Sequence, residues 1–284
     1  MKKSVILVMA TLLAACHDGG GHHHNDDVIV KPVTPEIAMP GAVQTWAAGG
    51  NTAVAYAGDD NDDILKFTLD TNGAITAVNF DNRNYARQGN QNEYAHKDVK
   101  ETRTLNLVTL GRDAGMRYAD FGYAMETERD ITSTERDFYV FAGGDATKEL
   151  RRSDLNGATY TGTAVAYIES DMQNSVKNQI SQTDDAQLVV DANGNRTMSM
   201  NFSNADKPWY DVVVTNGKIA LSGGDNVAAE FKVDGMVMDS SYESVNAYGD
   251  TTAQEVVYRV GAEYENKITG REVEFDAAFG GVRQ

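Results

Sequence analysis

The chain has 284 residues, 42 acidic and 25 basic, and its formal net charge is −17. Loss of Lys2 and Lys3 with an N-terminal leader would leave 23 basic residues against the same 42 acidic ones, a net charge of −19. A surface this acidic repels polyphosphates and anionic lipid head groups. We therefore expect no nucleic-acid partner and no membrane attachment through a basic patch.

The first sixteen residues have the pattern of a bacterial lipoprotein signal. Two lysines precede the apolar run Val5–Leu13, which is followed by Ala14, Ala15 and Cys16. This run is shorter than the roughly 20 residues that a membrane-spanning helix needs. The sequence predicts a signal peptide over residues 1–15, and its resemblance to the lipobox implies that Cys16 is diacylated at the mature N-terminus. The alternative is an ordinary secretory signal with an incidental cysteine.

Residues 16–42 contain very few large apolar side chains. They include three consecutive glycines, the cluster His22–His24, and Asp26 and Asp27. Such a segment cannot offset its ordering entropy by burial, so we expect a lipidated flexible tether. Transition-metal binding by the histidines and aspartates is the alternative, because imidazole and carboxylate are competent ligands.

The region after the tether shows the alternating pattern of β-strands. Ile64–Leu69 and Ala74–Phe80 flank Asp70-Thr71-Asn72-Gly73, which is a hairpin signal because Asn-Gly tolerates positive φ. We predict a small antiparallel β domain over residues 43–153. Its further strands are expected at Leu105–Leu110, Met116–Met125 and Phe138–Phe141.

One long segment of this domain, Asp81–Lys100, is rich in amides and charges and is expected to be an irregular loop. Loops of this length in compact domains are uncommon and are often functional. The segment supplies Tyr85, Tyr94 and His96, which we predict as ligand-binding residues. We expect Trp46 and Trp209 to be packing residues.

The second half of the chain predicts a series of strands with hairpin spacing. Eight such strands suggest an up-and-down β-barrel over residues 154–284, because closure removes exposed strand edges. The expected strands are Ala158–Ile168, Ala186–Val190, Arg196–Phe202, Trp209–Thr215, Lys218–Leu221, Val227–Met238, Glu255–Tyr264 and Arg271–Phe279.

Signatures of enzymes are missing from the sequence. It has no Gly-x-Ser-x-Gly, no His-Glu-x-x-His, no P-loop and no paired cysteines, and His96 is the only histidine outside the tether. The run Asp59–Asp63 lacks the glycine and terminal glutamate of an EF-hand, so an acidic turn is favoured over a calcium site. We expect no catalytic residue, no metal and no cofactor.

Two segments near the middle of the chain resemble the joint of a known family. Phe138–Gly144 and Asn156–Ala164 are similar to the junction between the handle domain and the C-terminal barrel in transferrin-binding-protein-B-like and factor-H-binding-like surface lipoproteins of Gram-negative bacteria. The end of the chain, Phe275–Gln284, resembles the closing barrel strand of that family.

The resemblance implies an all-β protein with an N-terminal β handle domain followed by a C-terminal eight-stranded barrel. It also implies a non-enzymatic lipoprotein, anchored to the outer membrane by lipid and exposed at the cell surface. Its expected partners are a host protein or small host ligand and a dedicated outer-membrane translocator. Its size and layout are most similar to host-colonisation lipoproteins of nematode-symbiotic bacteria. Capture of haem or a haem carrier, with His96, Tyr85 or Tyr94 as axial ligand, is the alternative function.

Overall fold

The computed structural model describes residues 43–47, 50–57, 64–89, 92–98, 102–129, 134–172, 175–202, 210–222, 238–266 and 271–284. The signal sequence, Cys16, the tether, Asp59–Asp63 and Trp209 lie outside these residues. The described residues all belong to one compact unit. Their only helices are the 3-10 turns η1 (Ala146–Lys148) and η2 (Arg152–Leu155). In this part of the chain no helix has the length and apolar character needed to cross a membrane.

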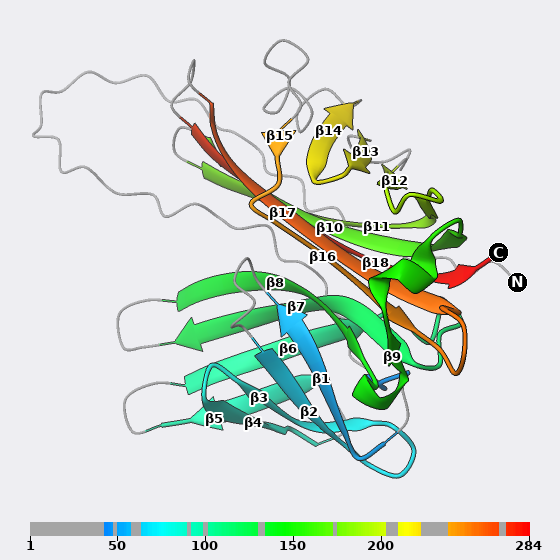
Figure 1. Ribbon diagram of the computed structural model, residues 1–284. Helices are drawn as coiled ribbons and strands as arrows, with labels where there is room; N and C mark the ends of the chain where they lie inside the picture. The colour runs from blue at the N-terminus through cyan, green and yellow to red at the C-terminus, as the bar shows by residue number, and fades with distance from the viewer. Residues whose placement is uncertain are drawn as a thin grey trace, which may run out of the picture. The chain divides into compact units, whose positions relative to one another are not determined.

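The first eight strands form a closed antiparallel barrel (Figure 1). Each strand pairs with the next along the chain, and β1 also pairs with β8, where Ala55 lies opposite Gly143. The strands are β1 (Thr52–Ala57), β2 (Ile64–Leu69), β3 (Ile75–Phe80), β4 (Arg83–Arg87), β5 (Glu93–Lys97), β6 (Thr102–Thr109), β7 (Ala119–Arg129) and β8 (Thr134–Gly144).

The interior of this barrel is filled by side chains from alternate strand positions. In β1 and β2 every second residue is buried, as expected for strands with one face toward a core. Trp46 is buried at 1% exposure, and its ring centroid lies 4.7 Å from that of Phe67. The ring of Phe141 is 5.7 Å from Phe67. The expectation that Trp46 is a packing residue is therefore confirmed.

The rest of the chain forms a second, curled antiparallel sheet of ten strands. Their hydrogen-bonded order is β15-β14-β13-β12-β11-β10-β18-β17-β16-β9. Its two outermost strands, β9 and β15, have two residues each. The strands are β9 (Glu149–Leu150), β10 (Thr159–Met172), β11 (Ser175–Val190), β12 (Arg196–Phe202), β13 (Tyr210–Thr215), β14 (Lys218–Ser222), β15 (Met238–Asp239), β16 (Tyr242–Tyr248), β17 (Glu255–Asn266) and β18 (Arg271–Arg283).

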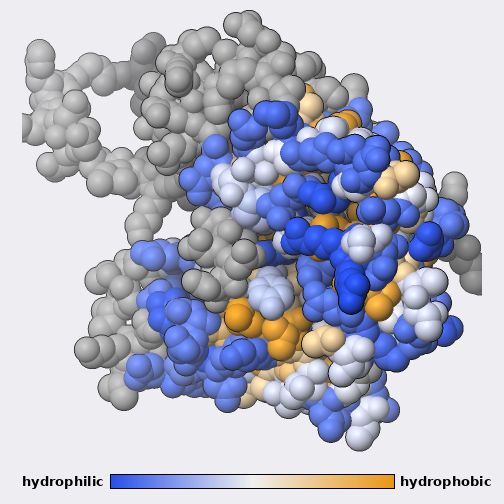
Figure 2. All heavy atoms as spheres, viewed as in Figure 1, coloured by the Kyte–Doolittle hydropathy of each residue, from blue (hydrophilic) through white to orange (hydrophobic). Residues whose placement is uncertain are grey.

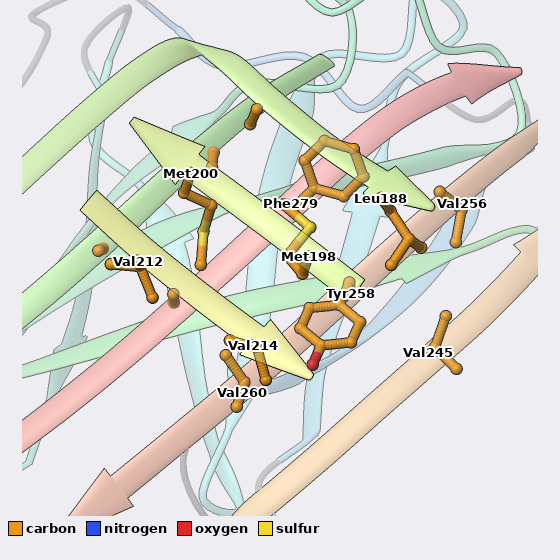
Figure 3. Close-up of a cluster of buried hydrophobic side chains, with 14 of the residues drawn as sticks. Leu188, Met198, Met200, Val212, Val214, Val245, Val256, Tyr258, Val260 and Phe279 are labelled. Atoms are coloured by element: carbon orange, nitrogen blue, oxygen red, sulfur yellow. The ribbon is translucent and has the colours of Figure 1, made fainter. Parts of the chain in front are cut away.

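The concave face of the curled sheet has a core of aliphatic, methionine and aromatic side chains (Figure 3). The labelled side chains come from β11 to β13 and from β16 to β18, and they converge on one space. Short turns join several strands, and the predicted turn at Thr215-Asn216-Gly217 is confirmed, with φ of 48° at Asn216 and 78° at Gly217.

A third cluster of buried side chains joins the barrel to the curled sheet. It contains Phe121 and Tyr123 of β7, so these two residues pack as core. The rings of Phe138 and Tyr167 stack with centroids 5.0 Å apart. Gly280 is needed at this contact, because a Cβ there would lie 2.2 Å from the ring of Phe121.

One buried carboxylate, Glu255, links the two sheets, and a second, Asp120, is bonded within the barrel part beside it. Glu255 at the start of β17 accepts hydrogen bonds from the backbone N–H groups of Arg117 (2.7 Å), Tyr118 (2.8 Å) and Ala119 (3.1 Å). Asp120 is fully buried and accepts from the N–H groups of residues 47, 111 and 121. Burial raises the pKa of Asp120 to about 7, against the opposing effect of these hydrogen bonds.

The all-β class is confirmed, and so is the presence of an eight-stranded antiparallel barrel. The position of the closed barrel, however, differs from the prediction. It closes within residues 52–144, the predicted handle, whereas the strands of residues 154–284 form the curled sheet. Closure follows from the pairing of β1 with β8, a long-range contact that no local pattern specifies.

Five observed strands are absent from the predicted set, namely β1, β4, β5, β9 and β16. The strand expected at Val227–Met238 lies outside the described residues except for Met238. The predicted boundary at 153/154 stays a prediction, although strand pairing already changes from barrel to sheet between β8 and β9.

Candidate functional site

The segment expected to be an irregular loop is folded into the barrel wall. Ten of its residues form β4 and β5, with Ala86 paired to Ala95, so the loop prediction is wrong. Tyr85 and Tyr94 are fully buried, while His96 is partly exposed. The physical reason is that a short strand needs only alternate apolar side chains on its inner face, so a polar sequence can still form a barrel wall.

Tyr94 is the deepest of the three predicted residues. Its hydroxyl donates to the backbone carbonyl of Ile75 at 3.2 Å, and burial raises its pKa. The ring belongs to the same core cluster as Trp46 and Phe67. The side chain of Tyr94 is fully buried and packs in the barrel wall, and its role in ligand binding stays a prediction.

Tyr85 and His96 lie side by side at one end of the barrel. Their ring centroids are 5.8 Å apart, and Tyr85 donates a hydrogen bond to Glu126 on β7. Burial, followed by this hydrogen bond, raises the pKa of Tyr85. His96 Nδ1 lies 3.1 Å from the carbonyl oxygen of Asn84. Because that oxygen only accepts, Nδ1 is the donor in this contact, and in the neutral imidazole the lone pair is then on Nε2.

Cross-strand pairing places a series of charged side chains next to Tyr85 and His96. We call these residues together the charged row. His96 is paired with Arg103, Arg103 with Glu128, and Glu128 with Glu135. Two residues before Glu128 on β7, Glu126 is opposite Asp137 of β8. The charged row consists of Tyr85, His96, Arg103, Glu126, Glu128, Glu135 and Asp137.

Arg103 is the one arginine of the charged row, and it forms ion pairs with two of its carboxylates. Arg103 Nη2 lies 2.5 Å from Glu128 Oε2, and Arg103 Nη1 lies 3.5 Å from Glu126 Oε1. Glu126 is 3% exposed, whereas Glu135 and Asp137 are exposed. Burial, then the charges of Glu126 and Glu135, raise the pKa of Asp137. The row is therefore net negative, and its exposed members are acids.

This arrangement suits attraction of cationic groups more than catalysis. Its acids are held by a fixed β scaffold, and the partly exposed His96 is the residue among the three predicted ones that a ligand can contact. In the described part of the chain no three His, Cys, Asp or Glu residues are arranged to hold a metal ion.

Sequence reasoning found Tyr85 and His96 but missed Arg103, Glu126, Glu128, Glu135 and Asp137. The signal that could have found them is alternation: Leu105 and Arg103 share a face of β6, as Ala124 and Glu126 do on β7. Charged residues that continue an inward-facing apolar series near a strand end indicate a polar barrel end. The register between strands was still needed to assemble them.

No protein-family model and no curated protein matches this chain. Among solved structures it is similar to a double mutant of the vaccine antigen transferrin-binding protein B from Haemophilus parasuis Hp5, at 16% identity and a TM-score of 0.43, over 82% of this chain and 44% of that one. It is also similar to the haemoglobin receptor HpuA from Kingella denitrificans, at 12% identity and a TM-score of 0.30, over 91% and 92% of the two chains. The chain spans less than half the length of the transferrin-binding structures it matches.

Proposed function

We propose that the protein is a lipid-anchored surface lipoprotein of the outer membrane that binds a host molecule and supports host association or colonisation. The observation that carries the binding proposal is the charged row, in which four carboxylates of β7 and β8 accompany one arginine at an end of a closed barrel. Fixed charges on a scaffold of this kind favour a partner with complementary charge. We therefore propose a host protein that presents a basic surface.

The surface of the described residues agrees with recognition by charge. Hydrophilic residues dominate the face seen in Figure 2, with small hydrophobic areas among them. The exposed large hydrophobic residues of the described chain are Val54, Tyr56, Val189 and Val213, each at 38–40% exposure. These are scattered between β1, β11 and β13, so they do not form one extended apolar interface.

The sequence supports the anchoring part of the proposal. Cys16 stands at the end of a lipobox-like signal, and the acidic chain offers no basic patch as a substitute anchor. The two segments that resemble the family joint flank the change from barrel to sheet, since Phe138–Gly144 ends β8 and Asn156–Ala164 leads into β10. Export by a dedicated outer-membrane translocator, and a role like that of colonisation lipoproteins of nematode-symbiotic bacteria, belong to this proposal.

Anchoring is tested by replacing the cysteine. Cys16→Ser should release the protein from membranes, because each buried acyl methylene contributes about 0.8 kcal/mol. The measurement is fractionation of cells after a salt wash, with protease shaving of intact cells for the unsubstituted protein. A serine variant that stays with the outer membrane would refute the lipoprotein proposal, and full protection from protease would refute surface exposure.

Binding is tested by capture from host fluid with the full Cys16→Ser chain, read by mass spectrometry. We expect a basic host protein whose capture weakens as salt is added. Glu135→Gln with Asp137→Asn should weaken its affinity about tenfold, because both acids are exposed members of the charged row. The matched control is Asp113→Asn with Asp185→Asn, which removes the same charge at exposed positions outside the row.

Equal losses in both double variants would show that only net charge matters and would overturn the charged row as the site. His96→Ala should also weaken capture, since its ring is the partly exposed aromatic of the row. Tyr85 is proposed to position this ring, and Tyr94 to support the wall beneath it.

Haem or haem-carrier capture is the second candidate, and one observation favours it. The hydrogen bond of His96 Nδ1 to Asn84 leaves Nε2 with the lone pair that an axial ligand needs. The carboxylates of Glu126 and Glu128 nearby would repel haem propionates, which places this function second. Absorbance spectra of the full Cys16→Ser chain with added haemin test it: a Soret shift that His96→Ala abolishes would favour haem over a basic protein.

A further inference from the structure

A second candidate site lies at one end of the curled sheet, and none of its lining residues belongs to the charged row. It is a hollow of about 200 Å³. Arg152 of η2 and Arg196 of β12 line it, and the apolar residues Leu155, Val190 and Val245, each 1–3% exposed, form its floor. In a chain with net charge −17, a hollow lined by two arginines and no acid is unusual.

The walls of this hollow are held by local hydrogen bonds. Asp191 Oδ1 accepts from the N–H groups of Asn193 (2.7 Å) and Asn195 (2.9 Å), which closes the turn between β11 and β12. Gly194 has φ of 86° and lies against Asn156, where an added Cβ would be 3.3 Å from the side-chain oxygen. The turn and the loop after η2 therefore have little freedom to fill the space between them.

Arg196 is fixed in position by a bidentate ion pair. Its Nε and Nη2 lie 3.2 and 3.1 Å from the two carboxylate oxygens of Glu243, which also accepts from Tyr258 Oη at 2.9 Å. Within the described residues the third nitrogen, Nη1, makes no hydrogen bond. Arg152 is exposed and has no ion-pair partner among the described residues. Glu243 thus neutralises one of the two positive charges, and the other remains.

The geometry points to a binding site for a small organic carboxylate. Planar guanidinium groups match the carboxylate geometry, and hydrogen bonds between two charged groups are the stronger kind. The apolar residues Leu155, Val190 and Val245 would contact the uncharged part of such a ligand, which an inorganic anion lacks. The proposal goes beyond the binding of a host protein, because it uses other residues on the other sheet.

The size of the hollow limits the ligand. Cavities for drug-sized molecules are typically about 300–1,000 Å³, so this one suits a ring or short chain bearing one acid group. We choose benzoate as the probe, because it has one carboxylate and one apolar ring. For a ligand this small we expect a Kd of about 1 mM.

The test is a titration of the full Cys16→Ser chain with benzoate, followed by the backbone amide signals of residues 193–196 in NMR spectra. We expect saturable shifts confined to this turn and to residues 152–156. Arg152→Gln should weaken benzoate about tenfold. The matched control is Arg151→Gln, an exposed neighbour with the same charge that does not line the hollow, and its affinity should equal that of the unsubstituted chain.

Two further probes separate the parts of the proposal. Benzyl alcohol, which keeps the ring without the charge, should bind about tenfold more weakly. Inorganic phosphate should also bind more weakly than benzoate, because it cannot use the apolar wall. Absence of saturable benzoate shifts, equal binding of benzyl alcohol or phosphate, or equal losses in Arg151→Gln and Arg152→Gln would each overturn the site.

Discussion

The barrel and the curled sheet both bury one face of an antiparallel sheet without disulfides, but they do so in different ways. The barrel pairs its first strand with its last and packs aromatic rings such as Trp46, Phe67 and Phe141 inside. The curled sheet ends in two-residue strands and fills its concave face with aliphatic, methionine and aromatic side chains, among them Tyr258, Phe275 and Phe279. Full closure gives the backbone of every barrel strand hydrogen-bond partners on both sides. The strands are therefore held together at the barrel end even where their side chains are polar.

The polar groups at the ends of the two sheets differ accordingly. In the barrel, the buried carboxylate of Glu126 accepts a hydrogen bond from Tyr85, and Arg103 Nη1 lies 3.5 Å from its Oε1. In the curled sheet, Glu243 has a bidentate arginine and a tyrosine. The carboxylate of the sheet is better satisfied than that of the barrel. The substitutions below test this comparison.

The largest effect is expected from emptying the aromatic core of the barrel. Phe67→Ala should lower the free energy of unfolding by about 3–5 kcal/mol, because a fully buried ring in contact with Trp46 is replaced by a cavity. In a Trp209→Phe background, fluorescence of Trp46 reports on the barrel alone during urea unfolding. Phe275→Ala, a matched loss in the curled sheet, should shift the same transition if the two sheets unfold together. Separate shifts would show that the joint does not couple them.

The joint should be weakened by removal of one carboxylate. Glu255→Ala leaves three backbone N–H groups without their charged acceptor, and we expect a loss of about 1.5–3 kcal/mol. Exposed Glu263 on the same strand supplies the control, for which Glu263→Ala should change stability by less than about 0.5 kcal/mol. Similar losses in both variants, measured by urea unfolding, would argue against the role of Glu255.

The stability of the protein should depend on pH through the ionisation of Asp120. Its pKa is about 7 in the folded protein, above its ordinary value of 3.8, so between these values the folded state binds more protons than the unfolded state. Its contribution is therefore complete below about pH 4 and is lost as pH rises to 7, by no more than about 1.4 kcal/mol per pH unit. The difference in unfolding free energy between wild type and Asp120→Asn, measured from pH 4 to 8, should fall along this window. A flat difference would show that burial does not raise this pKa.

The last pair of substitutions compares two tyrosine hydroxyls. Tyr85→Phe removes the tyrosine donor from Glu126, whereas Tyr258→Phe leaves Glu243 with both arginine contacts. We expect a loss of about 1.5–3 kcal/mol for Tyr85→Phe and about 0.5–1.5 kcal/mol for Tyr258→Phe. Thermal melts of the two variants make the comparison. A larger loss in Tyr258→Phe would reverse our view of which carboxylate is better satisfied.

Sequence patterns alone predicted the all-β class, several strands and three turns, at residues 70–73, 191–195 and 215–217, correctly. Alternation placed strands at Ile64–Leu69 and near Ile75–Phe80, and the turn between them is present with Asp70 Oδ1 accepting from the N–H groups of Asn72 and Ala74. These features depend on neighbours within a few residues, which is why local sequence determines them. For the candidate site, the sequence singled out Tyr85 and His96 but interpreted their segment as a loop.

Only the tertiary structure decided where the barrel closes and which charges meet. Closure joins Ala55 to Gly143, and the charged row joins His96 to Arg103, Glu128 and Glu135 through three successive strand pairs. A strand alternates in the same way whether its sheet is open or closed, so periodicity carries no information about the partner of its free edge. The hollow between η2 and the β11–β12 turn likewise arises from segments that meet only through the curl of the sheet.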